Sequence, residues 1–95
     1  MKLLWTVKAR TDLLAQLRFI AQDNPDAADK MNQLLLAKAS ALERFPQMGR
    51  EGRVAGTREL LLPPHYVLVY KVSEETVYIV AVLHTSRQYP PEDIS

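Results

Sequence analysis

Basic and aromatic side chains are the residues of this chain best suited to chemistry, and they lie in its second half. Arginine can hold a phosphate through two parallel hydrogen bonds, a tyrosine ring can stack on a base, and histidine or tyrosine can move a proton. Together they would suit metal-free cleavage of RNA, in which the 2′-hydroxyl attacks its own phosphate. The set is Arg50, Arg53, Arg58, Tyr66, Tyr70, His84, Arg87 and Tyr89.

Several members of this set also have a plain structural interpretation. Tyr66 and Tyr70 share one face of an expected strand, where they would pack in the core or at its rim. His84 follows an apolar strand and fits an ordinary strand-end position. The arginine-rich stretch around Arg53 is compatible with nucleic acid or an acidic protein partner, and equally with a solvated loop. These alternatives stay open on the residues alone.

Other kinds of site find no support in the sequence. The chain has no cysteine, and its 2 histidines, His65 and His84, form no ligand cluster, so we expect neither a disulfide nor a zinc site. No glycine-rich phosphate loop follows a strand and opens a helix. No paired carboxylates stand in an apolar setting. We therefore expect no metal and no cofactor.

Length and composition limit the class of protein. A chain of 95 residues with 47% hydrophobic residues makes one globular domain, which we expect over residues 1–95. The lack of cysteine fits a reducing compartment. Lys8 and Arg10 interrupt the apolar N-terminal stretch before it reaches signal-peptide length, and no segment approaches the roughly 20 apolar residues of a membrane span. These features predict a cytoplasmic protein that does not associate with membranes.

The elements that must position the chemical side chains follow from hydrophobic periodicity. A short strand over residues 3–7 precedes a helix over residues 8–22, whose apolar residues recur every three to four positions. Asn24 and Pro25 are a typical N-cap and first helical residue, and the second helix is predicted over residues 25–45. So short a link requires the two helices to lie antiparallel.

Beyond the second helix the hydrophobic period changes to two. Residues 47–56 form an expected loop that holds all 3 glycines, and strands are predicted over residues 57–62, 66–72 and 76–83. The last strand is apolar on both faces and should be central, and short connections favour antiparallel neighbours. The sequence therefore predicts an α+β fold in which an N-terminal strand and an antiparallel helical hairpin pack on a mainly antiparallel β-sheet.

Short sequence motifs accompany these elements in a specific order. They are Trp5-Thr6, Ala9-Arg10, Asp12-Leu13, Asp23-Asn24-Pro25, Phe45-Pro46, Gly49-Arg50, Gly52-Arg53-Val54, Gly56-Thr57-Arg58-Glu59-Leu60, Tyr66 to Tyr70, Val82-Leu83-His84, and Arg87 with Pro90. Each motif is weak alone, but their order and spacing are specific. By these motifs the chain resembles, over essentially its whole length, the ParE/RelE superfamily of bacterial type II toxins.

The resemblance implies a RelE/ParE-like toxin encoded beside a cognate antitoxin. The antitoxin's disordered or helical segment would wrap the helical hairpin and sheet in a toxin–antitoxin hetero-oligomer. The superfamily divides by target. RelE-like members are metal-free endoribonucleases that cut mRNA on the ribosome. ParE-like members, the plasmid-stabilisation branch, bind DNA gyrase and trap it without a catalytic site of their own.

One position in the strand over residues 66–72 distinguishes the two branches. Ribonuclease members carry an arginine in a Tyr-Arg-Leu-Val-Tyr-like motif, and this chain has Val67 at that position. A valine cannot stabilise the charge of a phosphorane. The lysine pair that ribonucleases place before this strand is missing, and Arg58 is the nearest cation. Arg87 and Tyr89, in contrast, resemble the arginine and tyrosine near the end of ribonuclease members. The balance favours the ParE branch.

Three interpretations follow from the resemblance. The first is a toxin that inhibits DNA gyrase, with target contacts from Arg50, Arg53, Arg58, Arg87 and Tyr89. The second is a ribosome-dependent mRNA interferase whose catalytic residues are Arg58, His84, Arg87 and Tyr89. The third is an inactive homologue that only binds its antitoxin.

Overall fold

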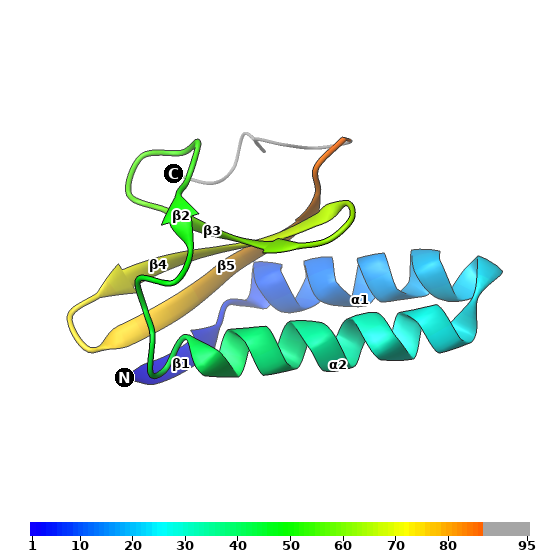
Figure 1. Ribbon diagram of the computed structural model, residues 1–95, viewed down its shortest axis with the longest axis horizontal. Coiled ribbons are helices and arrows are strands. Elements are labelled where there is room, and N and C mark those ends of the chain that lie inside the picture. Colours follow the sequence, from blue (N-terminus) through cyan, green and yellow to red (C-terminus); the bar gives the residue numbers. More distant parts are fainter. Residues whose placement is uncertain (87–95) are drawn as a thin grey trace.

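A helical hairpin lies against one face of a β-sheet in the computed structural model of this chain, which describes residues 1–86 (Figure 1). Arg87 and Tyr89 lie outside the described residues. The arrangement confirms the predicted α+β class. The elements are, in order, β1 (Lys2–Trp5), α1 (Val7–Asp23), α2 (Pro25–Ala41), β2 (Arg50–Glu51), β3 (Arg58–Leu62), β4 (Tyr66–Ser73) and β5 (Thr76–His84).

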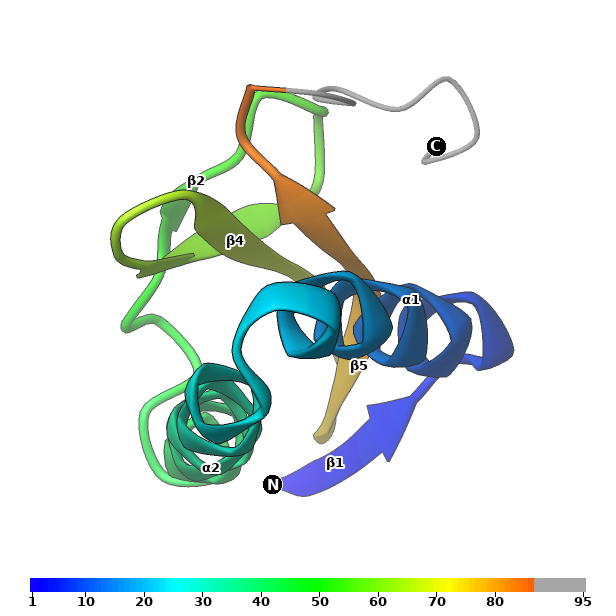
Figure 2. The same ribbon diagram turned by 90° about the vertical axis from the view of Figure 1, so that its right-hand side faces the viewer.

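Both helices begin at polar residues that cap their first amides. The Oγ1 of Thr6 accepts a hydrogen bond from the Ala9 N–H at 3.1 Å, and the Oδ1 of Asn24 accepts one from the Ala27 N–H at 3.0 Å. Pro25 takes the first helical position, where its missing N–H is not needed. Asn24 is the single residue between α1 and α2, and the helices run side by side and antiparallel, as predicted (Figure 1). Figure 2 shows the two helices close to end-on, both below the strands β4 and β2.

The regular part of α2 ends earlier than the sequence indicated, at Ala41 rather than Phe45. The next three amides bond three residues back instead of four, beginning with Leu42 N–H to the Ala39 carbonyl at 3.1 Å. A tighter last turn is common at helix ends, and Pro46 disfavours helical geometry at the residue before it. Leu42 still points into the core, whereas Phe45 is 60% exposed and does not continue the apolar stripe.

The strand order within the described residues is β1-β5-β4-β3-β2 in one 5-stranded sheet. β1 pairs in parallel with β5, and the remaining pairs are antiparallel. β5 is therefore internal, as its apolar composition predicted, although β4 holds the middle position. The expected loop over residues 47–56 contains β2, which pairs Arg50 with Glu59 and Glu51 with Arg58. Two charged residues between glycines carry no periodicity that could have predicted a strand.

The sheet has a helix face and an outer face. On the helix face, Leu68 of β4 and Ile79 of β5 join residues of both helices in the main core. On the outer face, four side chains form a smaller buried cluster, against which Val54 and Val80 pack. A register shift places Val80 as the extra residue between the pairs Tyr70–Ile79 and Val69–Ala81, so β5 exchanges its faces there. The cluster is Val67, Val69, Ala81 and Leu83.

Side chains of α1 complete the edge of β5 where β1 stops. The last residue of β1, Trp5, pairs with Ile79. Three residues further along β5, the Val82 N–H donates to the Oδ2 of Asp12 at 3.1 Å, and the Gln16 amide donates to the Val82 carbonyl at 3.5 Å. Asp12 thereby supplies an acceptor that a neighbouring strand would otherwise supply. Among the described residues, no helix is long and apolar enough to cross a membrane.

Candidate functional site

The segment that carries the predicted arginines is fixed at its start by Tyr70. The buried hydroxyl of Tyr70 donates to the Pro46 carbonyl and accepts from the Gly49 N–H, both at 2.8 Å. Burial raises the pKa of Tyr70, and the Gly49 hydrogen bond and the charge of Arg58 oppose this. A side chain at position 49 would clash, because a Cβ there would lie 2.7 Å from the hydroxyl. Tyr70 is therefore a buried anchor of this segment.

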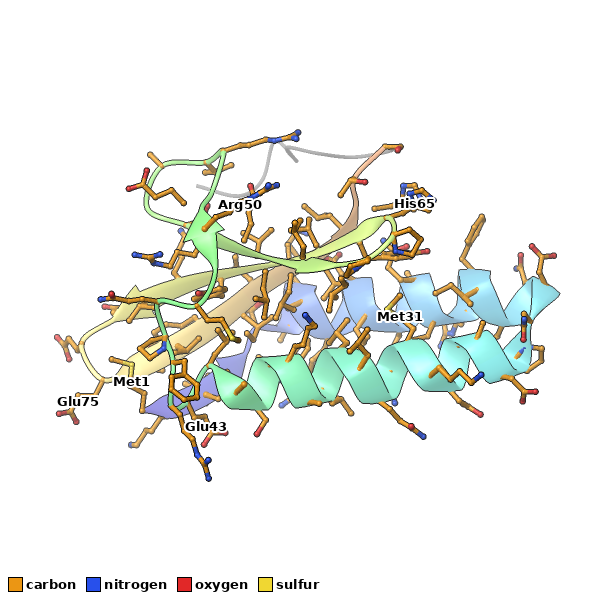
Figure 3. The ribbon with its side chains drawn as sticks, in the orientation of Figure 1. Met1, Met31, Glu43, Arg50, His65 and Glu75 are labelled. Carbon is orange, nitrogen blue, oxygen red and sulfur yellow. The ribbon has the colours of Figure 1, made fainter. Side chains whose placement is uncertain are left out.

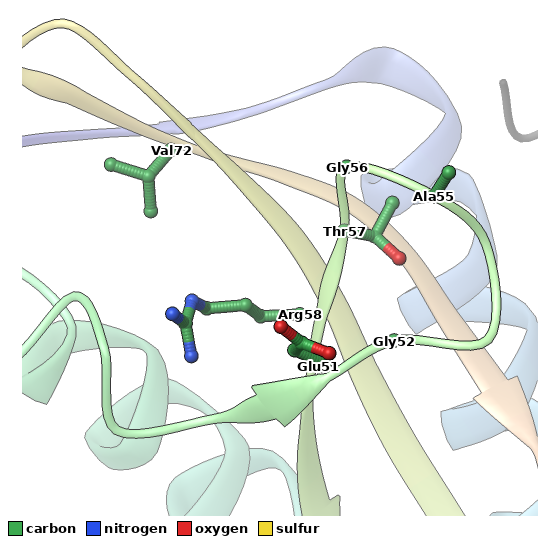
Figure 4. A pocket seen from close by; sticks show the side chains of 7 residues that line it. All are labelled: Glu51, Gly52, Ala55, Gly56, Thr57, Arg58 and Val72. Atoms are coloured by element: carbon green, nitrogen blue, oxygen red, sulfur yellow. The ribbon is translucent and has the colours of Figure 1, made fainter.

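Arg58 lies at the start of β3, on the helix face. It pairs with Tyr70 across the ladder and lies on the same side as Leu60 and Leu62. Its Nη1 donates to the Gly49 carbonyl at 2.7 Å. The guanidinium borders a polar hollow of about 370 Å³ (Figure 4). The hollow is lined by Glu51, Gly52, Ala55, Gly56, Thr57, Arg58 and Val72.

Arg50 and Arg53 converge on the outer face through the carboxylate of Glu59 (Figure 3, where Arg50 is labelled). The Oε1 of Glu59 accepts from the Nε and Nη2 of Arg50 at 3.2 and 3.1 Å. Its Oε2 accepts from the backbone N–H of Arg53 at 2.9 Å. Glu59 is only 3% exposed, whereas the Arg50 side chain is 55% exposed. One buried carboxylate thus holds both arginine positions.

A tight turn closes the segment behind Arg53. The Gly52 N–H donates to the Thr57 carbonyl at 2.8 Å, and the Thr57 hydroxyl donates to the Val54 carbonyl at 2.6 Å. Gly56 has a φ of 82°, a left-handed conformation that suits glycine. We call residues 49–57 the arginine loop. Its backbone is held by hydrogen bonds at both ends and by Glu59 in the middle.

His84 lies at the other end of the sheet from Arg58. Its ring stacks on His65 with centroids 5.4 Å apart and makes a T-shaped contact with Tyr66, with centroids 5.2 Å apart. Arg58 pairs with Tyr70, whereas His84 pairs with Tyr66, four residues earlier on β4. Four strand residues span about 13 Å, so these two predicted catalytic residues do not share one site.

The structure therefore divides the set that the sequence suggested. It brings Arg50 and Arg53 together on the outer face, leaves Arg58 on the helix face, and places His84 at the opposite end. Arg87 and Tyr89 lie outside the described residues.

Glu59 is a site residue that sequence reasoning missed. Its signal was a carboxylate at an alternate position of an apolar strand, close to several arginines. Within residues 1–86, no three potential metal-ligating residues of the His, Cys, Asp and Glu types form a group that could hold a metal ion.

Known proteins are similar to this chain in sequence and in fold. A family model described as "ParE toxin of type II toxin-antitoxin system, parDE" matches residues 3–89. The chain is 36% identical over 87 residues to toxin Y4kP of Sinorhizobium fredii, which covers 90% of both chains. It is 37% identical over 86 residues to toxin RelE2 of Caulobacter vibrioides, covering 90% of this chain and 97% of that one.

A solved structure agrees with these sequence relatives. The chromosomal ParDE TA system from P. aeruginosa matches with a TM-score of 0.75 and 26% identity, over 88% of this chain and 95% of that chain. The family match and the relatives together cover most of the chain, and the observed helical hairpin and sheet fit the same fold. This chain therefore belongs to the ParE toxin family of type II toxin–antitoxin systems, within the ParE/RelE superfamily.

Proposed function

We propose that this toxin acts by binding and inhibiting DNA gyrase rather than by cleaving mRNA. The observation that carries the proposal is the outer face at Val67, where ribonuclease members of the superfamily carry an arginine. Val67 is 1% exposed and packs in an apolar cluster with Val69 and Leu83. A phosphorane needs donors or cations aimed at its developing charge, and the apolar side chains of this cluster supply none. Val67 does border a small hollow with Arg50 and Arg53, but the Arg50 guanidinium there is bound to the Glu59 carboxylate.

The positions of the remaining predicted catalytic residues support the same proposal. Arg58 and His84 lie about 13 Å apart along the strands. The Nδ1 of His84 accepts the Ser86 N–H at 3.2 Å, so this nitrogen already has a partner within the chain. A histidine that transfers a proton and an arginine that stabilises the developing charge must both reach the same substrate. This separation favours a contact surface over an assembled active site.

We propose that the target is contacted through the arginine loop, together with Arg58, Arg87 and Tyr89. Arg50 and Arg53 lie together on the outer face. Arginine pairs well with planar carboxylates, so an acidic region of gyrase is the expected counterpart.

We further propose that a cognate antitoxin covers the helical hairpin. Several large apolar side chains on it are exposed to solvent, which is typical of a surface that binds a partner. On this basis the hairpin would receive an apolar segment of the antitoxin in a hetero-oligomer. The exposed residues are Val7, Leu14 and Phe19 on α1, and Leu34 and Leu36 on α2.

The test is brief expression of the toxin without antitoxin, with plasmid supercoiling and mRNA integrity followed in parallel. Gyrase inhibition predicts relaxed or linearised DNA and a damage response while mRNA stays intact. Co-expression of the antitoxin should restore growth, and a Leu14→Glu, Leu34→Glu variant should lose that protection while remaining toxic.

One relative bears the name RelE2, so mRNA cleavage is the alternative that this test must address. Cuts at defined codon positions that disappear in Arg87→Ala would overturn the gyrase proposal in favour of an interferase. A chain that arrests no growth but still binds the antitoxin would instead be an inactive homologue.

A further inference from the structure

We infer that the polar hollow beside Arg58 is a binding site for one carboxylate of the target protein, which the Arg58 guanidinium holds and from which Glu51 excludes nucleic acid. The inference rests on the proposed function, because the occupant would belong to the protein that the toxin inhibits. It assigns to the hollow an aspartate or glutamate side chain rather than a phosphate.

Two neighbouring residue pairs of the β2–β3 ladder carry the same charges but use them differently. On the outer face, Arg50 pairs with Glu59, and the Arg50 Nη2 lies 3.1 Å from the Glu59 Oε1. On the helix face, Glu51 pairs with Arg58, yet no ion pair joins their side chains in the described part of the chain. Opposite charges directly across a ladder normally attract each other. The second pair therefore leaves the Arg58 guanidinium without a carboxylate partner among residues 1–86.

Arg58 is instead held by the backbone of the arginine loop. Its Nη1 donates to the Gly49 carbonyl at 2.7 Å, and the Gly49 N–H in turn donates to the hydroxyl of Tyr70 at 2.8 Å. Figure 4 shows the guanidinium turned away from the Glu51 carboxylate. A guanidinium has five N–H donors, so the contact with Gly49 leaves donors for a ligand. Because its position is already fixed, Arg58 loses little conformational entropy when it binds an anion.

Burial and room make a carboxylate a favourable occupant. Arg58 is half-buried, so its charge has lost part of its hydration without a neutralising neighbour, and an anion would compensate for this. The Thr57 hydroxyl already donates to the Val54 carbonyl at 2.6 Å. Arg58 is thus the cation of the described lining, and about 370 Å³ leaves room for an acidic side chain with adjoining backbone. A carboxylate also matches the planar guanidinium through two parallel hydrogen bonds.

Glu51 makes the same hollow unsuitable for nucleic acid. It is exposed and lies in the lining opposite Arg58, so the two charges of the described lining cancel. Proteins bind nucleic acid largely by neutralising several phosphates with several cations. A chain of phosphates entering this hollow would meet one guanidinium and one carboxylate. A single carboxylate can bind the guanidinium on the side that is turned away from Glu51, so the charges favour a protein segment.

The hollow lies where a partner could also reach the outer face. Within the described residues, β2 is the last strand at one edge of the sheet. Arg50 lies on its outer face, and Glu51 lies beside the hollow on its helix face. A protein segment that passes over this edge can therefore place a carboxylate on Arg58 while it contacts the arginine loop.

The experiment places opposite charges at Val72, which lines the hollow and is 38% exposed. Val72→Glu puts a competing carboxylate beside Arg58, whereas Val72→Lys adds a second cation at the same place. Both lose the packing of valine, so they share any structural cost. Loss of a charge-assisted contact corresponds to about tenfold or more. We therefore expect gyrase inhibition and growth arrest at least about tenfold weaker in Val72→Glu and not weakened in Val72→Lys. Equal effects in the two variants would overturn the inference.

The matched control is Ser73→Glu, which adds the same charge one residue further along β4. Successive side chains of a strand point to opposite faces, so this carboxylate lies on the face away from the hollow. Ser73 is exposed, and the substitution should leave gyrase inhibition, growth arrest and antitoxin affinity unchanged. A loss equal to that in Val72→Glu would show that added negative charge acts from anywhere at this end of the sheet, and would overturn the inference.

A double-mutant cycle tests whether the effect passes through Arg58. Arg58→Gln alone should weaken growth arrest at least about tenfold, and Val72→Glu should add no more than about twofold in that background. Losses that multiply would show that the two residues act separately, and would overturn the assignment of the hollow to Arg58. Where Arg58→Gln fails to fold, as judged by circular dichroism, the opposite responses of the two Val72 variants decide alone.

Growth arrest keeps this test distinct from that of the proposed function. A wild-type toxin that arrests growth without affecting supercoiling would refute gyrase as the target, while opposite effects of Val72→Glu and Val72→Lys on growth arrest would still support a carboxylate in the hollow. A labelled single-stranded RNA that binds the wild-type toxin and is lost in Arg58→Gln would assign the hollow to a phosphate and overturn the inference.

Discussion

The two faces of the sheet have different roles, although neighbouring residues of the same strands form them. On β3, Leu60 faces the helices and joins the main core, whereas Glu59 beside it faces outward and binds Arg50. On β4, Leu68 and Val67 divide in the same way between the main core and the small outer cluster. The comparison teaches that the helix face supplies stability, and that the outer face supports a surface that we assign to target binding.

The largest effect should come from the helix face. Leu68 is completely buried between the sheet and the helices, so Leu68→Ala leaves a cavity and should lower the free energy of unfolding by about 3 kcal/mol. Urea denaturation followed by circular dichroism measures this change. The matched control is Leu61→Ala on β3, because Leu61 is 44% exposed and should cost less than about 1 kcal/mol. Equal losses of unfolding free energy in the two variants would show that the helix face is not the main source of stability.

Tyr70 links the two faces, because it lies in the main core and anchors the arginine loop. Tyr70→Phe keeps the ring but leaves the Gly49 N–H and the Pro46 carbonyl without their partner. We expect a loss of about 1–3 kcal/mol in unfolding free energy, together with weaker growth arrest, because the loop backbone is released. Unchanged toxicity in a folded Tyr70→Phe variant would show that the loop does not depend on this anchor.

The same tyrosine predicts a pH dependence of stability. Burial raises the pKa of Tyr70 in the folded state above its ordinary value of 10.0. Above that pH the unfolded chain releases the phenolic proton while the folded chain retains it, so the unfolded state binds fewer protons. Stability should therefore be complete below about pH 10 and should fall as the pH rises through the folded pKa. Tyr70→Phe should flatten this alkaline decline in thermal denaturation.

Much of the fold could be predicted because its signals are local. Thr6 and Asn24 cap the helices through bonds to residues three positions away, and strand periodicity depends on adjacent residues. The parallel pairing of β1 with β5 was missed because it joins segments more than 70 residues apart, and the short strand β2 was missed because its two charged residues carry no periodicity. The end of α2 was placed too late because the apolar pattern continues to Phe45, although its side chain is exposed.

The candidate site was harder to predict than the fold. The sequence identified arginines by type, but only the strand register assigns Arg50 to the outer face and Arg58 to the helix face. Glu59 was missed because its role depends on Arg50, a partner nine residues away in the sequence, and on its burial in the folded chain. Face assignment in β5 also depends on the register shift at Val80, which breaks simple alternation.

A smaller effect is expected at the outer cluster. Val67→Ala removes two methyl groups from a cluster of few side chains, so the unfolding free energy should fall by about 1–2 kcal/mol, less than for Leu68→Ala. Growth arrest should persist in this variant, because Val67 takes no part in target contact under the gyrase proposal. Loss of toxicity in a folded Val67→Ala variant would show that this cluster itself belongs to the target-binding surface of the outer face.

The smallest effect on stability should accompany a large effect on function. Arg53 is exposed, so Arg53→Gln should change the unfolding free energy by no more than about 0.5 kcal/mol. Removal of its charge should nevertheless weaken growth arrest at least about tenfold, because a guanidinium–carboxylate contact in an interface is directed and desolvated. Arg18→Gln on α1 is the matched control, since Arg18 is an exposed arginine on the opposite side of the sheet. If both variants lose toxicity equally, net charge rather than the position of Arg53 would govern target binding. The outer face would then not be a specific target-binding surface.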